Sequence, residues 1–243
     1  MQKIIKIEKG VTRMPEWRMA EPVDFELCDG EHIAIVGPNG GGKSMLVDIL
    51  IGRHPLIMTE PQYDFSPSTK PLAADNIKYI TFRDSYGDSD GTYFLQQRWN
   101  QQEIDEETPR VGSELEKAYH MAGEDTPERR ALQSHLYSLF HIEHLMDKYL
   151  ILMSSGELRK FLLINILTSR PDILIIDNPY IGLDADSRLL FNSLLGNIIA
   201  DGTTIIMLLC NPNEIPQFTD YVIPMEHLSI GETIAVTNQN YSE

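Results

Sequence analysis

The chain of 243 residues has little cysteine, few basic residues and no long hydrophobic run. Its two cysteines, Cys28 and Cys210, are too few for a disulfide scaffold and are typical of a reducing compartment. No stretch of about 18 apolar residues occurs, as a membrane-spanning helix requires, and the first residues lack the apolar segment of a secretion signal. The sequence therefore predicts a cytoplasmic protein, which would reach the inner face of a membrane only through a partner.

Basic residues are outnumbered by acidic ones, 20 to 36, and the formal net charge is −16. A surface this negative repels a phosphate backbone over the range of the Debye length, which argues against a nucleic-acid partner. A local basic pocket for a few phosphates is compatible with that charge. The hydrophobic content of 42% and charged content of 23% lie in the ordinary globular range.

Apolar strands that alternate with helices dominate the second half of the chain. The predicted elements there are a helix over 158–169, a strand over 173–177, a helix over 185–200 and a strand over 203–209. Unbroken apolar strands between helices predict an α/β fold with a mainly parallel sheet covered on both faces. Residues 23–28 and 31–36 flank Asp29-Gly30, so we expect them to form an antiparallel hairpin near the N-terminus.

The region between these two parts is helical in pattern. Apolar residues at helical spacing predict two or three helices between about 111 and 149, without the sustained heptads of a coiled-coil arm. We therefore expect an α/β core made of residues 1–97 and 151–243, with residues 98–150 as an inserted helical subdomain.

A glycine-rich segment satisfies the pattern G-x-x-x-x-G-K-[ST]. It follows an apolar strand and opens a helix, which is the context that a phosphate-binding loop requires. In such a loop successive backbone N–H groups converge on phosphate oxygens, the lysine reaches the β- and γ-phosphates, and the serine hydroxyl holds Mg²⁺. The residues expected to bind nucleotide here are Gly37, Pro38, Asn39, Gly40, Gly41, Gly42, Lys43 and Ser44.

Asp177 ends the apolar strand ILIID and is the candidate carboxylate for completing a magnesium site with Ser44. Alone it could equally be a turn aspartate at the end of a strand. The phosphate loop upstream favours the metal-binding interpretation.

Two further segments, Met153-Ser-Ser-Gly-Glu157 and Asn178-Pro179-Tyr-Ile-Gly-Leu183-Asp184, follow the loop in a fixed order. Together with the loop and the helical insert, they resemble the ATP-binding cassette (ABC) ATPases over essentially the whole chain. The resemblance implies a phosphate-loop NTPase core with an N-terminal antiparallel β portion and a helical insert. SSGE alone would be weaker, since it is also a good helix N-cap with a carboxylate three residues on.

The resemblance also implies Mg²⁺ and ATP as ligands and a head-to-tail dimer with a second cassette, identical or different, fused or separate. In that dimer Ser154, Ser155, Gly156 and Glu157 would contact the partner's nucleotide. A membrane permease is a further partner that it implies. GTYFLQQRWN, taken with SSGE, is similar to the tandem cassettes of molybdate transport and photorepair, of which a chain this long covers one cassette.

Two positions depart from the family where it cleaves ATP. Asn178 stands where the family has a glutamate, and an amide cannot accept the proton of an attacking water, although it can orient that water. Cys210 falls where the family has a histidine, unless that alignment is off by one residue, and a thiol is a weak donor. The sequence predicts weak or partner-dependent hydrolysis; the alternative is a regulatory or adaptor module that binds nucleotide without turning it over.

The sequence leaves two further binding residues open, one for magnesium and one for adenine. Phe82 stands where the family often has a magnesium-binding glutamine, so Gln97 is our candidate, although QQRWNQQ could also be a solvated helix start. For stacking on adenine we expect Trp17, with Arg13 as a cation–π substitute. Trp17 could equally be a core residue.

Overall fold

The computed structural model describes residues 2–82 and 108–236, and it divides into two compact units. The first unit comprises Met1–Thr81, Pro171–Pro179 and Leu195–Glu243, and the second comprises Phe82–Arg170 and Tyr180–Leu194. The expected boundary between residues 97 and 98 lies outside the described residues, so the predicted division into 1–97, 98–150 and 151–243 stays a prediction.

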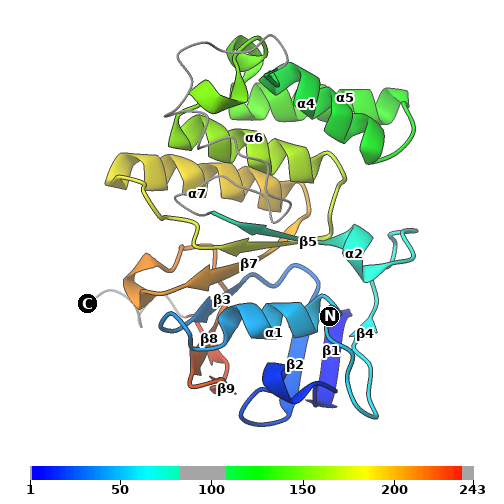
Figure 1. The fold of residues 1–243 in the computed structure, drawn as a ribbon, viewed down its shortest axis with the longest axis vertical. Helices are drawn as coiled ribbons and strands as arrows, with labels where there is room; N and C mark the ends of the chain where they lie inside the picture. The colour runs from blue at the N-terminus through cyan, green and yellow to red at the C-terminus, as the bar shows by residue number, and fades with distance from the viewer. Residues whose placement is uncertain (1, 83–107, 237–243) are drawn as a thin grey trace. The chain divides into compact units, whose positions relative to one another are not determined.

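The first unit contains two sheets (Figure 1). The smaller one is antiparallel, with the strand order β2-β1-β4. The larger one has the order β10-β8-β3-β7-β6-β5, with β9 paired to β8, and its four pairings among β8, β3, β7, β6 and β5 are all parallel. The strands are β1 (Lys3–Gly10), β2 (Val23–Cys28), β3 (Ile33–Val36), β4 (Gln62–Tyr63), β5 (Ile77–Thr81), β6 (Ile173–Asp177), β7 (Thr204–Leu209), β8 (Tyr221–Glu226), β9 (Ser229–Ile230) and β10 (Ile234–Ala235). The mainly parallel α/β fold and its antiparallel N-terminal portion are thus confirmed.

The expected hairpin between residues 23–28 and 31–36 is wrong. A turn does form at Asp29-Gly30, where Glu31 N donates to Cys28 O at 3.2 Å, but it leads from one sheet to the other. β2 alternates between buried and exposed residues and pairs with β1, whereas all four residues of β3 are buried and pair with β7 and β8. A strand buried on both faces belongs inside a parallel sheet, so the change from alternating to unbroken apolar pattern overrides the turn signal.

Helix α1 (Lys43–Leu50) packs its apolar face into the core shared by the two sheets of the first unit. Leu46, Val47, Ile49 and Leu50 are buried in the same cluster as residues of β1, β2 and β3. The helix ends at Leu50, two residues before Gly52, which adopts a φ of +75°. The shorter helical elements of this unit are α2 (Ala73–Asn76), η1 (Pro15–Trp17) and η4 (Pro212–Glu214).

The second unit is helical and has α6 in contact with both α4 and α5 (Figure 1). Its elements are α4 (Val111–Met121), α5 (Pro127–Phe140), η2 (Glu143–Leu145), η3 (Leu150–Leu152) and α6 (Ser155–Leu167). Two α-helices and a 3-10 turn between residues 111 and 149 agree with the two or three helices expected there. The boundary between the units passes through α7 (Ala185–Ala200).

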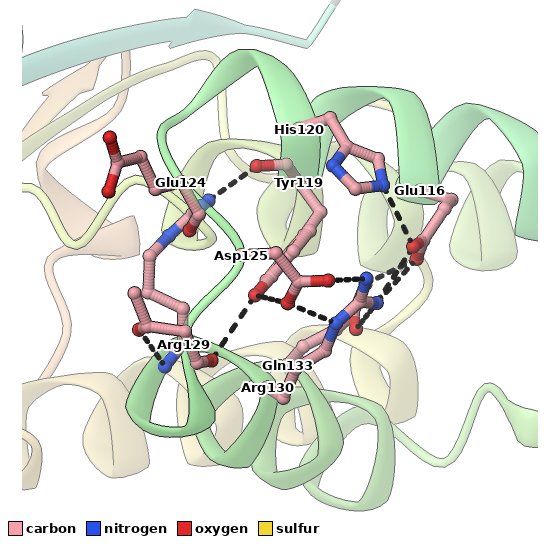
Figure 2. A network of polar contacts seen from close by, with 9 residues as sticks. Glu116, Tyr119, His120, Glu124, Asp125, Arg129, Arg130 and Gln133 are labelled. Carbon is pink, nitrogen blue, oxygen red and sulfur yellow. Dashed lines mark hydrogen bonds and ion pairs between the residues drawn. The ribbon is translucent and has the colours of Figure 1, made fainter.

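A polar network ties α4 to α5 across the loop that joins them (Figure 2). The ring of buried Tyr119 has the guanidinium groups of Arg129 and Arg130 over it, at 4.2 and 4.0 Å from its centroid. Arg130 forms two hydrogen bonds of 2.8 Å with Asp125, and its Nη1 lies 2.7 Å from Oε1 of Glu116. Arg130 therefore connects the loop, α4 and α5, and holds the hairpin of the second unit together.

Candidate functional site

The candidate site of the first unit lies where neighbouring parallel strands end. β3, β7 and β6 are adjacent, with Val36 paired to Leu209 and Asp177 paired to Leu208. The residues that directly follow these strands therefore meet at one edge of the sheet, which is where α/β sheets place their ligands.

The glycine-rich segment forms a tight loop between β3 and α1. A side chain at Gly37 would place its Cβ 1.9 Å from the carbonyl oxygen of Met225, so only glycine fits there. Gly42 is the N-cap of α1 in the left-handed conformation, with a φ of +106°, which glycine adopts without strain. The loop therefore leads directly into the positive end of α1, as a phosphate cradle requires.

Lys43 turns its ammonium group back onto this loop. Its Nζ donates to the carbonyl oxygens of Gly37 at 2.7 Å and Pro38 at 3.0 Å, and the residue is only 7% exposed. A buried ammonium held by neutral carbonyls has no carboxylate to neutralise it among the ion pairs of the described residues. This arrangement suits an anionic ligand such as a nucleotide phosphate.

Cys210 lies beside Lys43, and Asn178 lies next to Cys210. The Cys210 sulfur is 3.7 Å from Lys43 Nζ, 3.9 Å from Asn178 Oδ1 and 3.1 Å from Asn39 Oδ1. Asn178 has a φ of +52°, a left-handed conformation that asparagine tolerates better than most residues. The structure thus brings a thiol to the lysine of the phosphate loop, with the amide of Asn178 next to that thiol.

Asp177, the expected magnesium ligand, is buried, with 7% exposure. Its Oδ2 accepts a hydrogen bond of 2.8 Å from the hydroxyl of Tyr79, a residue of β5 that sequence reasoning missed. Burial raises the pKa of Tyr79, while hydrogen bonds with the hydroxyl groups of Thr81 and Ser44 act in the opposite direction. The phenol oxygen therefore contacts Asp177, one of the two expected magnesium ligands. Tyr79 shares a face of β5 with Thr81, the residue paired with Asp177, and that pairing is not specified by any local pattern in the sequence.

The segment with the signature pattern lies in the second unit, at the start of α6. This helix begins at Ser155 and not at the predicted 158, because Ser154 is its N-cap. Ser154 Oγ accepts from Glu157 N at 3.3 Å, and Glu157 Oε2 accepts from Ser154 N at 2.7 Å, which completes a capping box. Ser154, Ser155 and Gly156 are exposed at the positive end of this helix.

Glu157 also forms an ion pair with Lys148, at 2.7 Å. Burial alone would raise the pKa of Glu157, but the hydrogen bonds from Lys148 and Ser154 together outweigh it and lower the pKa. Glu157 is therefore a structural part of the helix start, whatever else it contacts.

The last two expected ligands differ in what the structure says of them. Trp17, at the end of η1, is 37% exposed and stacks on the ring of His54, with 4.0 Å between centroids. One face of its indole is therefore covered by histidine, so adenine could stack only on the other. Gln97 lies outside the described residues. Among residues 2–82 and 108–236, no group of three or more His, Cys, Asp or Glu side chains could hold a metal ion.

Fold and site together define a phosphate-loop protein of the α/β class. A family model described as "ABC transporter" matches residues 20–181, and the chain belongs to that family. It is an ATPase cassette of the family, and no helix in the described part of the chain has the length and apolarity needed to cross a membrane. ABC ATPase domains bind ATP, generally with Mg²⁺, and the buried Lys43, the glycine loop and the buried carboxylate of Asp177 fit those ligands.

Individual relatives agree with this family. The chain is 28% identical over 235 residues to the ABC transporter ATP-binding protein ModF of Escherichia coli, covering 94% of this chain and 44% of ModF. It is 28% identical to the energy-coupling factor transporter ATP-binding protein EcfA2 of Streptococcus agalactiae, covering 87% of this chain and 72% of EcfA2. The structure of cbiO1 from Clostridium perfringens shares the fold, with a TM-score of 0.74, 22% identity, and coverage of 96% of this chain and 88% of cbiO1. The chain spans less than half the length of ModF.

Proposed function

We propose that this chain binds Mg-ATP in its own phosphate loop, dimerises with a second cassette, and has a degenerate hydrolytic site. Residues Gly37 to Ser44 would hold the phosphates, Lys43 the charge of the β- and γ-phosphates, and Trp17 the adenine. Ser44 and Asp177 would hold Mg²⁺, together with Gln97. The observation that carries this proposal is that the thiol of Cys210 lies against Lys43 and the amide of Asn178 lies against that thiol.

The partner cassette is proposed from the start of α6. Ser154 Oγ and the free N–H groups of the first helical turn form an anion-binding end. In the family, cassettes pair head to tail, so Ser154, Ser155, Gly156 and Glu157 would contact the γ-phosphate bound by the partner. That partner would be a second copy of this chain, a different cassette, or a cassette fused to this one. Because the chain covers 44% of ModF, we favour a tandem protein with two cassettes.

Transport is the process that the relatives favour. ModF and EcfA2 are both named as ATP-binding proteins of transporters. We therefore propose that closure of the cassette dimer on ATP drives a transporter, with the chain held at the inner face of the membrane by a permease. A related ATP-driven process without a permease uses the same closure, and the −16 charge makes a nucleic-acid substrate the poorer candidate.

A second candidate function is a regulatory or adaptor module that binds nucleotide and never hydrolyses it. The absence of a carboxylate at position 178 favours it, since general-base help is worth about 10²–10⁴ in rate. Single-turnover kinetics separate the two candidates: a slow ATPase converts one bound ATP to ADP, whereas an adaptor releases it intact.

The metal is tested by calorimetric titration of ATP with and without Mg²⁺. Asp177→Asn should leave the fold intact and remove most of the magnesium dependence, because an amide is a far weaker ligand for this cation than a carboxylate. Asp172→Asn is the control, because Asp172 directly precedes β6, at the opposite end of that strand from Asp177. A wild-type magnesium titration in Asp177→Asn would show that Asp177 is only a turn residue.

A further inference from the structure

Tyr79 is a hydroxyl-bearing residue at the candidate magnesium site to which the proposed function gives no role. It lies on β5, next to β6, and its hydroxyl donates to Oδ2 of Asp177 at 2.8 Å. The hydroxyl groups of Thr81 and Ser44 are its other polar neighbours. The phenol oxygen thus contacts the carboxylate expected to bind the metal.

We propose that Tyr79 is a positioning residue for magnesium, which holds one oxygen of Asp177 so that the other is presented to the metal. This inference rests on the proposed function, since it assumes that Ser44 and Asp177 bind Mg²⁺. The phenol is a neutral donor and a poor ligand itself, so it acts through the carboxylate. Because Oδ2 accepts the hydrogen bond from Tyr79, Oδ1 is the oxygen of Asp177 that would be left unengaged by Tyr79 to hold the cation.

The chemistry of magnesium makes such a restraint valuable. Mg²⁺ requires nearly ideal octahedral geometry and is usually bound by one or two carboxylates, with water and phosphate oxygens completing its shell. Residues that hydrogen-bond to a ligating carboxylate commonly change metal affinity by about 10–100-fold when they are removed.

The sharpest variant is Tyr79→Phe, which removes one oxygen atom and keeps the ring. We expect ATP affinity without metal to stay as in the wild type, while the gain in ATP affinity on adding Mg²⁺ falls about tenfold or more. Mn²⁺ provides a second readout: its affinity for the ATP-bound chain, followed by electron paramagnetic resonance, should fall in parallel. Neither measurement depends on hydrolysis.

Tyr63→Phe is the matched control. Tyr63 is also half-buried, and its hydroxyl donates to Leu50 O at 2.8 Å, at the far end of α1 from Ser44. It loses the same atom and a hydrogen bond of the same length, so any general loss of stability appears in both variants. The metal-dependent gain should be unchanged in Tyr63→Phe.

A double variant tests whether Tyr79 acts through Asp177. In the Asp177→Asn background, adding Tyr79→Phe should cause no further loss of metal dependence, because the group it positions has gone. A wild-type metal dependence in Tyr79→Phe, equal losses in both tyrosine variants, or an undiminished loss in the double variant would each overturn the inference. If instead the wild type itself gains no affinity from Mg²⁺, the proposed metal site fails, and Tyr79 with it.

Discussion

At the scale of single residues, Lys43 is the group on which nucleotide affinity should depend most. Its ammonium is buried and held only by carbonyl oxygens and a thiol among the described residues, so it can exchange these weak partners for phosphate. Lys43→Ala should weaken ATP binding by about 2–3 kcal/mol, the usual range for hydrogen bonds to a charged group. Calorimetry measures this, with Lys3→Ala as a control that removes an exposed lysine paired with Glu26. An unchanged affinity for ATP in Lys43→Ala would remove the basis for this role.

At Asn178, the substitution that should raise the rate of ATP hydrolysis should also lower the free energy of unfolding. Asn178→Glu supplies a carboxylate next to Cys210, which itself lies against Lys43, and should raise ATP hydrolysis in the presence of an active partner cassette. The φ of +52° disfavours glutamate, so the same variant should lose about 1 kcal/mol of unfolding free energy. Asn178→Asp, which tolerates the left-handed conformation better, separates the two effects by keeping a carboxylate with less strain. The rise in hydrolysis rate is expected to be larger when Cys210→His is added, so the double variant is the stronger test. If even the double variant hydrolyses ATP no faster than the wild type, position 178 does not limit the reaction.

The residues of the site were predictable to the extent that they belong to a linear pattern. The loop and Asp177 are read from a motif and from the end of an apolar strand, and Asn178 follows from its neighbour. Tyr79 was not predictable in this way, because its role depends on which strand pairs with β6, and nothing local specifies that β5 does. The stacking of Trp17 on His54 joins residues 37 positions apart for the same reason.

At the scale of elements, the α4–α5 hairpin should respond to acid through Arg130 (Figure 2). The hydrogen bonds from Arg130 hold the pKa of Asp125 well below its usual range. Burial would raise the pKa of Glu116, but bonds from Arg130 and Gln133 outweigh it and lower that pKa too. Lowered carboxyl pKa values contribute stability that is present above the ordinary values, 3.8 and 4.5, and is lost as the pH falls through the folded ones.

Arg130→Met should therefore flatten the loss of stability of the helical unit between about pH 5 and about pH 3. Urea unfolding followed by hydrogen exchange of α4 and α5 amides measures this unit specifically. Lys117→Met is the control, since Lys117 forms an ion pair with Glu114 on the surface of α4. An acid dependence in Arg130→Met as steep as in the wild type would place the acid-sensitive group elsewhere.

The elements themselves were largely predictable from periodicity. β6 and α7 have the predicted bounds, and the helices of the insert follow the spacing of their apolar residues. Two predictions were wrong for physical reasons. The hairpin was wrong because β3, although it follows the turn at Asp29-Gly30, is buried on both faces and pairs with β7 and β8. The start of α6 was wrong because the capping box places it at Ser155. A turn motif is local, whereas partner choice in a sheet depends on burial over the whole fold.

At the scale of the whole molecule, the account requires a second cassette. Ser154→Arg should place a long cation where the partner's γ-phosphate would bind, and so block hydrolysis at the partner's loop. ATP binding at this chain's own loop should be unchanged, because Ser154 belongs to the signature and not to that loop. Ser169→Arg, at the opposite end of α6, is the control for adding the same side chain. If Ser154→Arg weakens the chain's own ATP binding and leaves the partner active, the division of roles between the two sites is wrong.

The central claim is that the site built on this chain's own loop is catalytically degenerate. The most direct test is a multiple-turnover ATPase assay of the unmodified chain alone, with saturating Mg-ATP and with Asn178→Ala measured beside it. The account predicts at most slow release of phosphate by the wild type, and a rate that Asn178→Ala hardly changes. Brisk turnover by the unmodified chain that Asn178→Ala abolishes would contradict the claim.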